Sequence, residues 1–224
     1  LNDVVLKMVD LIMLTAPFAV FALLANVVVS SGDPELLYAL LFYSGVVVSG
    51  LLIMVCFYLT MVSVIAKRTP FWFLKQISPA QLLAFSTSSS AATLPVTMER
   101  VNKFLGVPKE IVSFVLPVGA TVNMDGTSLY QGVAALFIAQ AYGIHLDLPT
   151  QFTMLFVLML TSKGIAGVPR ASLVVVAATC GMFKIPIEGI ALILPIDHFC
   201  DMFRSGTNVL GNAVATSVVG KWEH

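Results

Sequence analysis

Residues 196–212 read IDHFCDMFRSGTNVLGN and lie within a long apolar run of the chain. At about 100° per residue, the charged and amide side chains of this stretch fall within an arc of roughly 80° on one helix face. These side chains are Asp197, Asp201, Arg204, Asn208 and Asn212. An ionised group at the centre of a bilayer costs at least about 2.5 to 3.5 kcal/mol. Three such groups on one face therefore predict ion pairing or a hydrated binding site.

The composition around this stretch is typical of a membrane protein. Of the 224 residues, 58% are hydrophobic and 11% are charged, whereas soluble domains have about 25% charged residues. Several apolar runs reach the roughly 20 residues that a helix needs to cross a hydrocarbon core of about 30 Å. The formal net charge is zero, which argues against a nucleic-acid partner. The three cysteines have no CxxC spacing, so we interpret them as small core residues.

Apolar runs and turn residues divide the chain into five segments. Because the chain begins with Leu1 and shows no signal-peptide n-region, we expect upstream helices to be missing. The segments are two crossings in 1–66 (about 4–29 and 36–65), a hairpin in 67–106, an interrupted helix in 107–145 (about 111–142), a second hairpin in 146–184 and a final helix in 185–224 (about 190–219).

Both hairpins consist of two apolar pieces that are too short to span a bilayer. The first piece of the first hairpin ends in the polar tract STSSS at 86–90, and the second piece is expected to begin near Thr93. The second hairpin turns at the small-residue tip SKGIAGVP, residues 162–169. Backbone can break at membrane depth only where protein or a wet cavity satisfies it. We therefore expect re-entrant helical hairpins.

The hairpins belong to an internal repeat. SSSAATLP at 88–95 aligns with SKGIAGVP at 162–169, and VPKEIVSFVLPV at 107–118 aligns with IPIEGIALILPI at 185–196. A hairpin returns to its starting side, so the single crossing between the repeats inverts one relative to the other. Inverted repeats with broken helices are typical of secondary transporters. The predicted fold class is an all-α membrane protein with inverted re-entrant hairpins and broken transmembrane helices.

Basic residues indicate the orientation. The side opposite the expected cytoplasmic face carries only Lys184, whereas the cytoplasmic face, by the positive-inside rule, carries eight: Lys7, Lys67, Arg68, Lys75, Arg100, Lys103, Lys109 and Lys221.

The polar stripe of the final helix is suited to a zwitterionic ligand. Arg204 can fork onto a carboxylate, Asp201 can accept from an ammonium, and Asn208 can donate to a second carboxylate. The alternative is a structural ion pair between Asp201 and Arg204, which explains neither Asp197 nor the amides.

The interrupted helix predicts a cation site. Unwinding at Asn123–Thr127 frees backbone carbonyls, which with the Asp125 carboxylate offer hard oxygens to an alkali cation. The alternative is a helix kink in which Asp125 bonds to a neighbouring hydroxyl. The tip at Ser88–Ser90 offers hydroxyls and backbone N–H groups to an anion, although serine tracts are usually only turns.

Four motifs together give a specific resemblance. They are TLPVTM after the serine tip (93–98), NMDGT (123–127), AGVP (166–169) and DxxxDMxRxxxN (197–208). With them the chain closely resembles, over essentially its whole length, the dicarboxylate/amino acid:cation symporter family. The resemblance implies an inner (plasma) membrane, multi-pass homotrimer rather than an enzyme, with a scaffold domain and a transport domain that slides like an elevator. The chain would correspond to the fifth helix onward, without the first four helices.

The resemblance also implies residue roles. Arg204 would bind the side-chain carboxylate of an acidic amino acid, and Asp201 its amino group. The implied substrate site comprises Ser89, Ser90, Thr127, Val168, Asp201, Arg204, Ser205 and Asn208. One sodium would bind at Gly119, Asn123, Asn208 and Asn212, a second at carbonyls of Thr121, Ser162, Lys163 and Ile165, and a third at Asp125 with the missing upstream helix.

Three residues depart from the family pattern. Many sodium-coupled members have Asp at the position of Asn212, Thr is usual at Ser205, and a small residue is common at Arg170. Because Asn212 is neutral, full sodium stoichiometry is in doubt and proton coupling stays an alternative.

Other function classes fit the residues less well. A serine hydrolase using Ser88–Ser90 and His198 lacks a Gly-x-Ser-x-Gly elbow, and His198 lies about 100° off the polar stripe. A C4-dicarboxylate symporter is the nearer alternative, and a channel built on the same broken-helix site is a further one.

Overall fold

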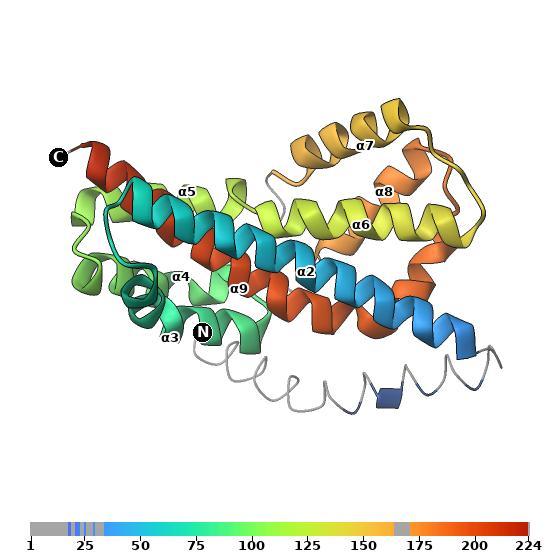
Figure 1. The fold of residues 1–224 in the computed structure, drawn as a ribbon, viewed down its shortest axis with the longest axis horizontal. Coiled ribbons are helices and arrows are strands. Elements are labelled where there is room, and N and C mark those ends of the chain that lie inside the picture. Colours follow the sequence, from blue (N-terminus) through green and yellow to red (C-terminus); the bar gives the residue numbers. More distant parts are fainter. Residues whose placement is uncertain are drawn as a thin grey trace, which may run out of the picture.

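The computed structural model describes residues 34–163 and 171–223, together with Phe18, Phe21, Ala22, Ala25 and Val29. The first predicted crossing therefore lies largely outside the described residues. The described residues form helices joined by turns and loops, with no strand among them (Figure 1). The helices are α2 (Pro34–Val64), α3 (Pro70–Thr87), α4 (Ser90–Glu99), the π-helical η1 (Arg100–Phe104), α5 (Lys109–Val122), α6 (Asp125–Ala141), α7 (Leu148–Thr161), α8 (Ala171–Met182), the 3-10 helix η2 (Ile187–Gly189) and α9 (Ile190–Trp222).

Helix α9 is the central element. It has 33 residues and contacts α2, α3, α5 and α6. In Figure 1, α2 runs alongside α9 for most of its length. On α2 the buried residues Leu40, Tyr43, Val47 and Leu51 recur every three or four positions, which places them on one helix face. The opposite side of α2 remains apolar and exposed, as Phe42 and Ile53 show, so this helix has an apolar surface all round.

One helix among the described residues has the length and apolarity of a membrane span, namely Glu35–Val64 within α2. Helix α9 is as long but carries Asp197, Asp201 and Arg204. Charged residues in the interior of a membrane protein lower the apparent hydropathy of the helix that bears them. Helix length and composition therefore do not by themselves give the number of membrane crossings.

The breaks predicted at the serine tract and at residues 123–127 are present, with shifted boundaries, whereas residues 164–169 of the second predicted tip lie outside the described residues. At the first tip, Ser88 adopts a left-handed conformation (φ 49°) and ends α3. The side chain of Ser89 then accepts a hydrogen bond from the backbone N–H of Ala92. Because this N-cap satisfies a free N–H group, α4 begins at Ser90 rather than near Thr93.

The interruption of the long helix is shorter than the predicted five residues. Helix α5 ends at Val122 and α6 begins at Asp125, so only Asn123 and Met124 lie outside helix. Gly126 and Thr127 belong to the first turn of α6, where their backbone N–H groups lack intrahelical partners. The break thus presents a helix N-terminus, and not only freed carbonyls, to its surroundings.

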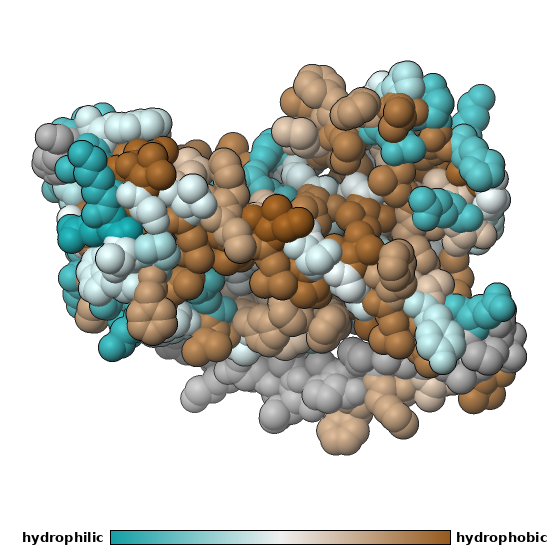
Figure 2. All heavy atoms as spheres, in the orientation of Figure 1, coloured by the Kyte–Doolittle hydropathy of each residue, from teal (hydrophilic) through white to brown (hydrophobic). Residues whose placement is uncertain are grey.

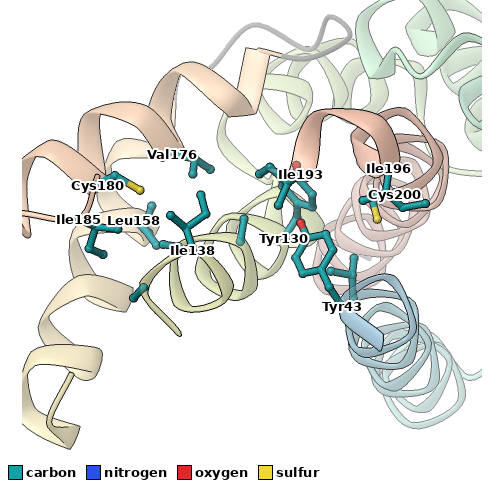
Figure 3. Close-up of a cluster of buried hydrophobic side chains, with 14 of the residues drawn as sticks. Tyr43, Tyr130, Ile138, Leu158, Val176, Cys180, Ile185, Ile193, Ile196 and Cys200 are labelled. Carbon is teal, nitrogen blue, oxygen red and sulfur yellow. The ribbon is translucent and has the colours of Figure 1, made fainter. Parts of the chain in front are cut away.

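Two hydrophobic clusters pack against different parts of α9. The first gathers Tyr43, Tyr130 and Ile138 around the α9 residues 193–200 (Figure 3). The second surrounds residues 209–218 of α9. Arg204 and Asn208 lie between these two clusters along the helix, so the apolar packing leaves the polar stripe in the middle of the molecule.

The pairs α3–α4 and α7–α8 lie in opposite halves of the molecule in Figure 1. Within each pair the two helices contact each other. Helices α5 and α6 lie between the two pairs in chain order.

Candidate functional site

The polar stripe of α9 is buried. Asp197, Asp201, Arg204, Asn208 and Asn212 are each no more than 4% exposed. Burial of a polar group is costly unless hydrogen bonds replace water. The partners of these five side chains therefore define the site.

Arg204 is held by side chains from two helices. One guanidinium nitrogen donates to the Asp201 carboxylate and another to the hydroxyl of Ser172 on α8. Its Nε has no hydrogen-bond partner among the described residues. The Asp201–Arg204 pair that we considered as a structural alternative is thus present, and Arg204 additionally reaches the second helix pair through Ser172.

The ring of Tyr130 on α6 adds to this cluster. The guanidinium carbon of Arg204 lies 5.3 Å from the centre of this ring, within the range of a cation–π interaction. The Tyr130 hydroxyl donates to the carboxylate of Asp197 at 2.6 Å. The aromatic side chain therefore links Asp197 and Arg204 of the stripe to α6.

Asn208 binds the N-terminus of α6. Its amide oxygen accepts from the backbone N–H of Gly126 at 2.9 Å, and its amide nitrogen donates to the Thr127 hydroxyl at 2.9 Å. A Cβ atom at Gly126 would lie 3.0 Å from the Asn208 oxygen, so this close approach favours glycine. The break in α5–α6 is what brings NMDGT and the stripe together.

Asn212 lies one turn further on and contacts α5. Its amide oxygen accepts from the side chain of Asn123 at 3.1 Å, and a Cβ atom at Gly119 would lie 2.8 Å from the same oxygen. Three of the four residues expected around one sodium, Gly119, Asn123 and Asn212, are therefore adjacent. Their oxygens are hard and neutral, a donor set compatible with an alkali cation held weakly.

Asp125 is turned toward other partners. One carboxylate oxygen accepts from the hydroxyl of Tyr58 on α2 at 2.8 Å, and the other lies 3.5 Å from the ammonium of Lys163 at the end of α7. From the sequence we expect Lys163 to contribute only a backbone carbonyl to one cation site. In the structure, its ammonium also lies beside the carboxylate of Asp125, which we expect to bind a different cation.

The remaining predicted residues are placed as follows. Ser162 exchanges a hydrogen bond with Ser128 at 2.7 Å, which ties α7 to α6. Thr121 is exposed and its hydroxyl donates within α5 to Val118. Ser205 donates to Asp201 at 3.3 Å. Ser89 and Ser90 are buried at the start of α4. Ile165, Val168 and Arg170 lie outside the described residues.

Sequence reasoning missed three contributors, Tyr58, Tyr130 and Ser172. Each is a hydroxyl side chain within an apolar helix, where a buried hydroxyl needs a polar partner. That signal was available for the two tyrosines, whereas serine and threonine hydroxyls in such helices often bond to their own backbone, as Thr60 does. Among the residues in 34–163 and 171–223, no group of three His, Cys, Asp or Glu side chains could hold a metal.

Comparison with known proteins decides the family. The model of the sodium:dicarboxylate symporter family matches residues 1–222. The chain belongs to this family. As a member of the sodium:dicarboxylate symporter family it is part of a membrane transporter, which removes the hydrolase interpretation of the serine tip.

Named relatives of this sodium:dicarboxylate symporter chain come from bacteria and animals. A proton/sodium-glutamate symport protein of Bacillus subtilis is 47% identical over 96% of this chain and 50% of the relative. A proton/glutamate-aspartate symporter of Escherichia coli is 41% identical over 100% of this chain and 51% of the relative. Excitatory amino acid transporter 3 of Mus musculus is 39% identical over 99% and 42%, respectively. The chain spans about half the length of the bacterial relatives it matches.

Proposed function

We propose that this chain carries the substrate and ion sites of a secondary symporter that imports an acidic amino acid together with sodium, protons or both. The observation that carries the proposal is the buried cluster of Arg204, Asp201 and Asn208 on one face of α9. The printed names of its relatives, glutamate and glutamate-aspartate symporters coupled to protons or sodium, support it.

The chemistry of the cluster suits a zwitterion with an extra carboxylate. Arg204 presents a planar fork that matches a carboxylate, and Asp201 accepts from an ammonium. A bound acidic amino acid would exchange the direct Asp201–Arg204 contact for one ion pair with each residue. Asn208 and Thr127, hydrogen-bonded to each other at 2.9 Å, would bind carboxylate oxygens, with Ser89, Ser90, Val168 and Ser205 completing the site.

Coupling ions would bind beside the substrate. Gly119, Asn123, Asn208 and Asn212 form one sodium site, and Asp125 forms another together with a helix upstream of this chain. A third uses backbone carbonyls of Thr121, Ser162, Lys163 and Ile165. Because Asn212 supplies a neutral oxygen, its site holds sodium less tightly than a carboxylate would, and protons are the alternative coupling ion.

The architecture we propose for the whole protein is a homotrimer in the plasma membrane. Residues 67–106 and 146–184 form the two re-entrant hairpins, 107–145 the interrupted helix between them, and 185–224 the final helix. With the second crossing of 1–66 they move as an elevator-type transport domain. The opposite placement of α3–α4 and α7–α8 (Figure 1) supports this inverted arrangement.

A C4-dicarboxylate:cation symporter is the second candidate, favoured by the description of the family as sodium:dicarboxylate symporters. The two candidates differ at Asp201. With a plain dicarboxylate bound, the Asp201 carboxylate would face an anion that offers no ammonium group. The loss of a charged hydrogen bond costs about 1.5 to 3 kcal/mol.

The test is uptake of radiolabelled glutamate, aspartate and succinate by the protein in liposomes under an imposed sodium or proton gradient. We expect saturable uptake of an acidic amino acid that requires at least one of the gradients. Current without substrate and without uptake would instead indicate a channel.

A further inference from the structure

A cavity of about 310 Å³ lies at the end of the molecule where α2 and α9 end, away from the polar stripe. This volume is at the lower end of the range of about 300 to 1,000 Å³ for small-molecule sites. Its walls come from the α2–α3 turn, the loop between η1 and α5, and the last turns of α9. Hydrophilic residues gather where α9 ends in Figure 2, beside a hydrophobic patch.

Three basic residues line this cavity, Lys67, Arg68 and Lys221, and none of its lining residues is acidic. None of the three forms an ion pair with another residue of the described chain, whereas nearby Lys103 is paired with Glu99 at 2.9 Å. Like charges that converge without a counter-ion repel one another. An anion in the cavity would relieve this repulsion.

The three basic side chains are exposed, and specific contacts order the walls around them. The guanidinium of Arg68 lies 5.3 Å from the ring centre of Trp72, so a cation–π contact holds its plane while other donors stay available. The side chain of Asn102 donates to the carbonyl of Val107 at 2.9 Å, which fixes the loop wall. At Gly106 a left-handed backbone (φ 76°) leaves open space where a side chain would stand.

The same end carries the markers of a membrane–water interface. The chain has two tryptophans, and both lie at this end. Trp72 lines the cavity, and Trp222 directly follows the lining residue Lys221. Tryptophan concentrates at the level of lipid headgroups, and basic residues concentrate on the cytoplasmic side. Basic pockets between transmembrane helices on that side are suited to phosphate-bearing lipid headgroups.

We propose that this cavity binds the phosphate group of an anionic phospholipid headgroup at the cytoplasmic surface. Lys67, Arg68 and Lys221 supply the charge, and Trp72 packs against the lipid beside the headgroup. The cavity is separate from the polar stripe of α9. Lipid binding to it can be measured without a transport assay, so the result does not depend on which substrate the protein transports.

The test uses native mass spectrometry of the purified protein with phosphatidylglycerol and, as the comparison with a zwitterionic headgroup of zero net charge, phosphatidylcholine. The pocket variant is Lys67→Gln/Arg68→Gln/Lys221→Gln. The matched control, Lys75→Gln/Arg100→Gln/Lys109→Gln, removes the same charges from the same face outside the cavity. We expect the pocket variant to bind phosphatidylglycerol at least tenfold more weakly and the control to bind it as the wild type does. Equal losses in both variants would mean general surface attraction and would overturn the proposal, as would no loss in the pocket variant.

Two further arms identify the source of the phosphate and the role of the cavity. Inorganic phosphate and glycerol 3-phosphate at millimolar concentration should not displace the lipid, and displacement by either would reassign the cavity to a soluble anion. Ser217→Phe fills the cavity from α9 without changing its charge. It should reduce lipid binding as the pocket variant does, with circular dichroism checking that the fold is kept. Undiminished binding by a folded Ser217→Phe protein would place the lipid elsewhere.

Discussion

The ammonium of Lys163 lies 3.5 Å from one carboxylate oxygen of Asp125, and the hydroxyl of Tyr58 donates to the other oxygen at 2.8 Å. Three elements, α2, α6 and the end of α7, thus meet at one carboxylate. A metal cation that binds Asp125 has to compete with a cation tethered to the second helix pair. The proposed cation site and the tip of that pair are therefore physically linked.

Replacing Lys163 with Met removes the competing charge and keeps most of the side-chain length. The side chains of Lys163 and Asp125 are 36% and 40% exposed, and partly exposed pairs contribute about 0 to 1 kcal/mol. We therefore expect the half-saturating sodium concentration of uptake to fall by up to about fivefold. Lys163→Arg should resemble the wild type, and Lys109→Met serves as the control for loss of a surface charge. An unchanged sodium response in Lys163→Met would show that the pair does not compete with the ion.

Asp125→Asn should abolish concentrative uptake. The substitution replaces the anionic oxygen that holds a hard cation most strongly, while the amide can still accept from Tyr58. Tyr58→Phe is the matched comparison, because it removes only the hydrogen bond and should weaken cation dependence without abolishing it. Uptake measured against sodium concentration and against a pH gradient separates the two. A fully coupled Asp125→Asn protein would exclude the carboxylate from coupling.

Arg204→Cys should eliminate uptake of acidic amino acids, because the guanidinium is the group that matches a side-chain carboxylate. Space and lost charge should permit neutral substrates such as serine or alanine. Ser172→Ala removes only one hydrogen-bond partner of the guanidinium. A lost hydrogen bond to a charged group costs about 1.5 to 3 kcal/mol, so a rise of roughly ten- to a hundredfold in KM for glutamate is expected. Near-native glutamate affinity in Arg204→Cys would reassign the arginine to a structural role.

Succinate should bind at least tenfold more weakly than L-aspartate or L-glutamate. It cannot offer an ammonium to Asp201, which is buried and would keep only protein partners. Competition with radiolabelled glutamate in the wild-type protein measures this ratio. Asp201→Asn should reduce the difference in affinity between succinate and the acidic amino acids, because a neutral amide does not require a cationic partner. If the wild-type protein bound succinate as tightly as glutamate, the proposed amino acid substrate would be contradicted.

Asn212→Asp should strengthen sodium dependence. The added carboxylate would face Gly119 and Asn123, which already surround the amide oxygen of Asn212. Gly119→Ala should act in the opposite direction, because its Cβ atom would lie 2.8 Å from that oxygen. Sodium titrations of uptake in both variants provide the measurement. Uptake that is indifferent to sodium in the wild type and in Asn212→Asp would assign the coupling to protons.

The amino-acid sequence by itself determined the polar stripe on α9, the broken helix and the membrane character of the chain. All three are local properties, because helical periodicity and the length of an apolar run are carried by neighbouring residues. The stripe from Asp197 to Asn212 could therefore be placed on one face without coordinates, and the structure confirms that it is buried.

Only the tertiary structure decided which side chains meet. Tyr58 and Asp125 are 67 residues apart, as are Tyr130 and Asp197, and Arg204 reaches back 32 residues to Ser172. Such contacts depend on how helices pack, because the sequence does not show which distant group a tyrosine hydroxyl reaches, and a serine hydroxyl in an apolar helix can bond to its own backbone instead. The start of α4 at Ser90 likewise depends on the side-chain cap from Ser89. Each serine of the tract has the same capping side chain, so only the geometry that packing allows decides which one caps the helix.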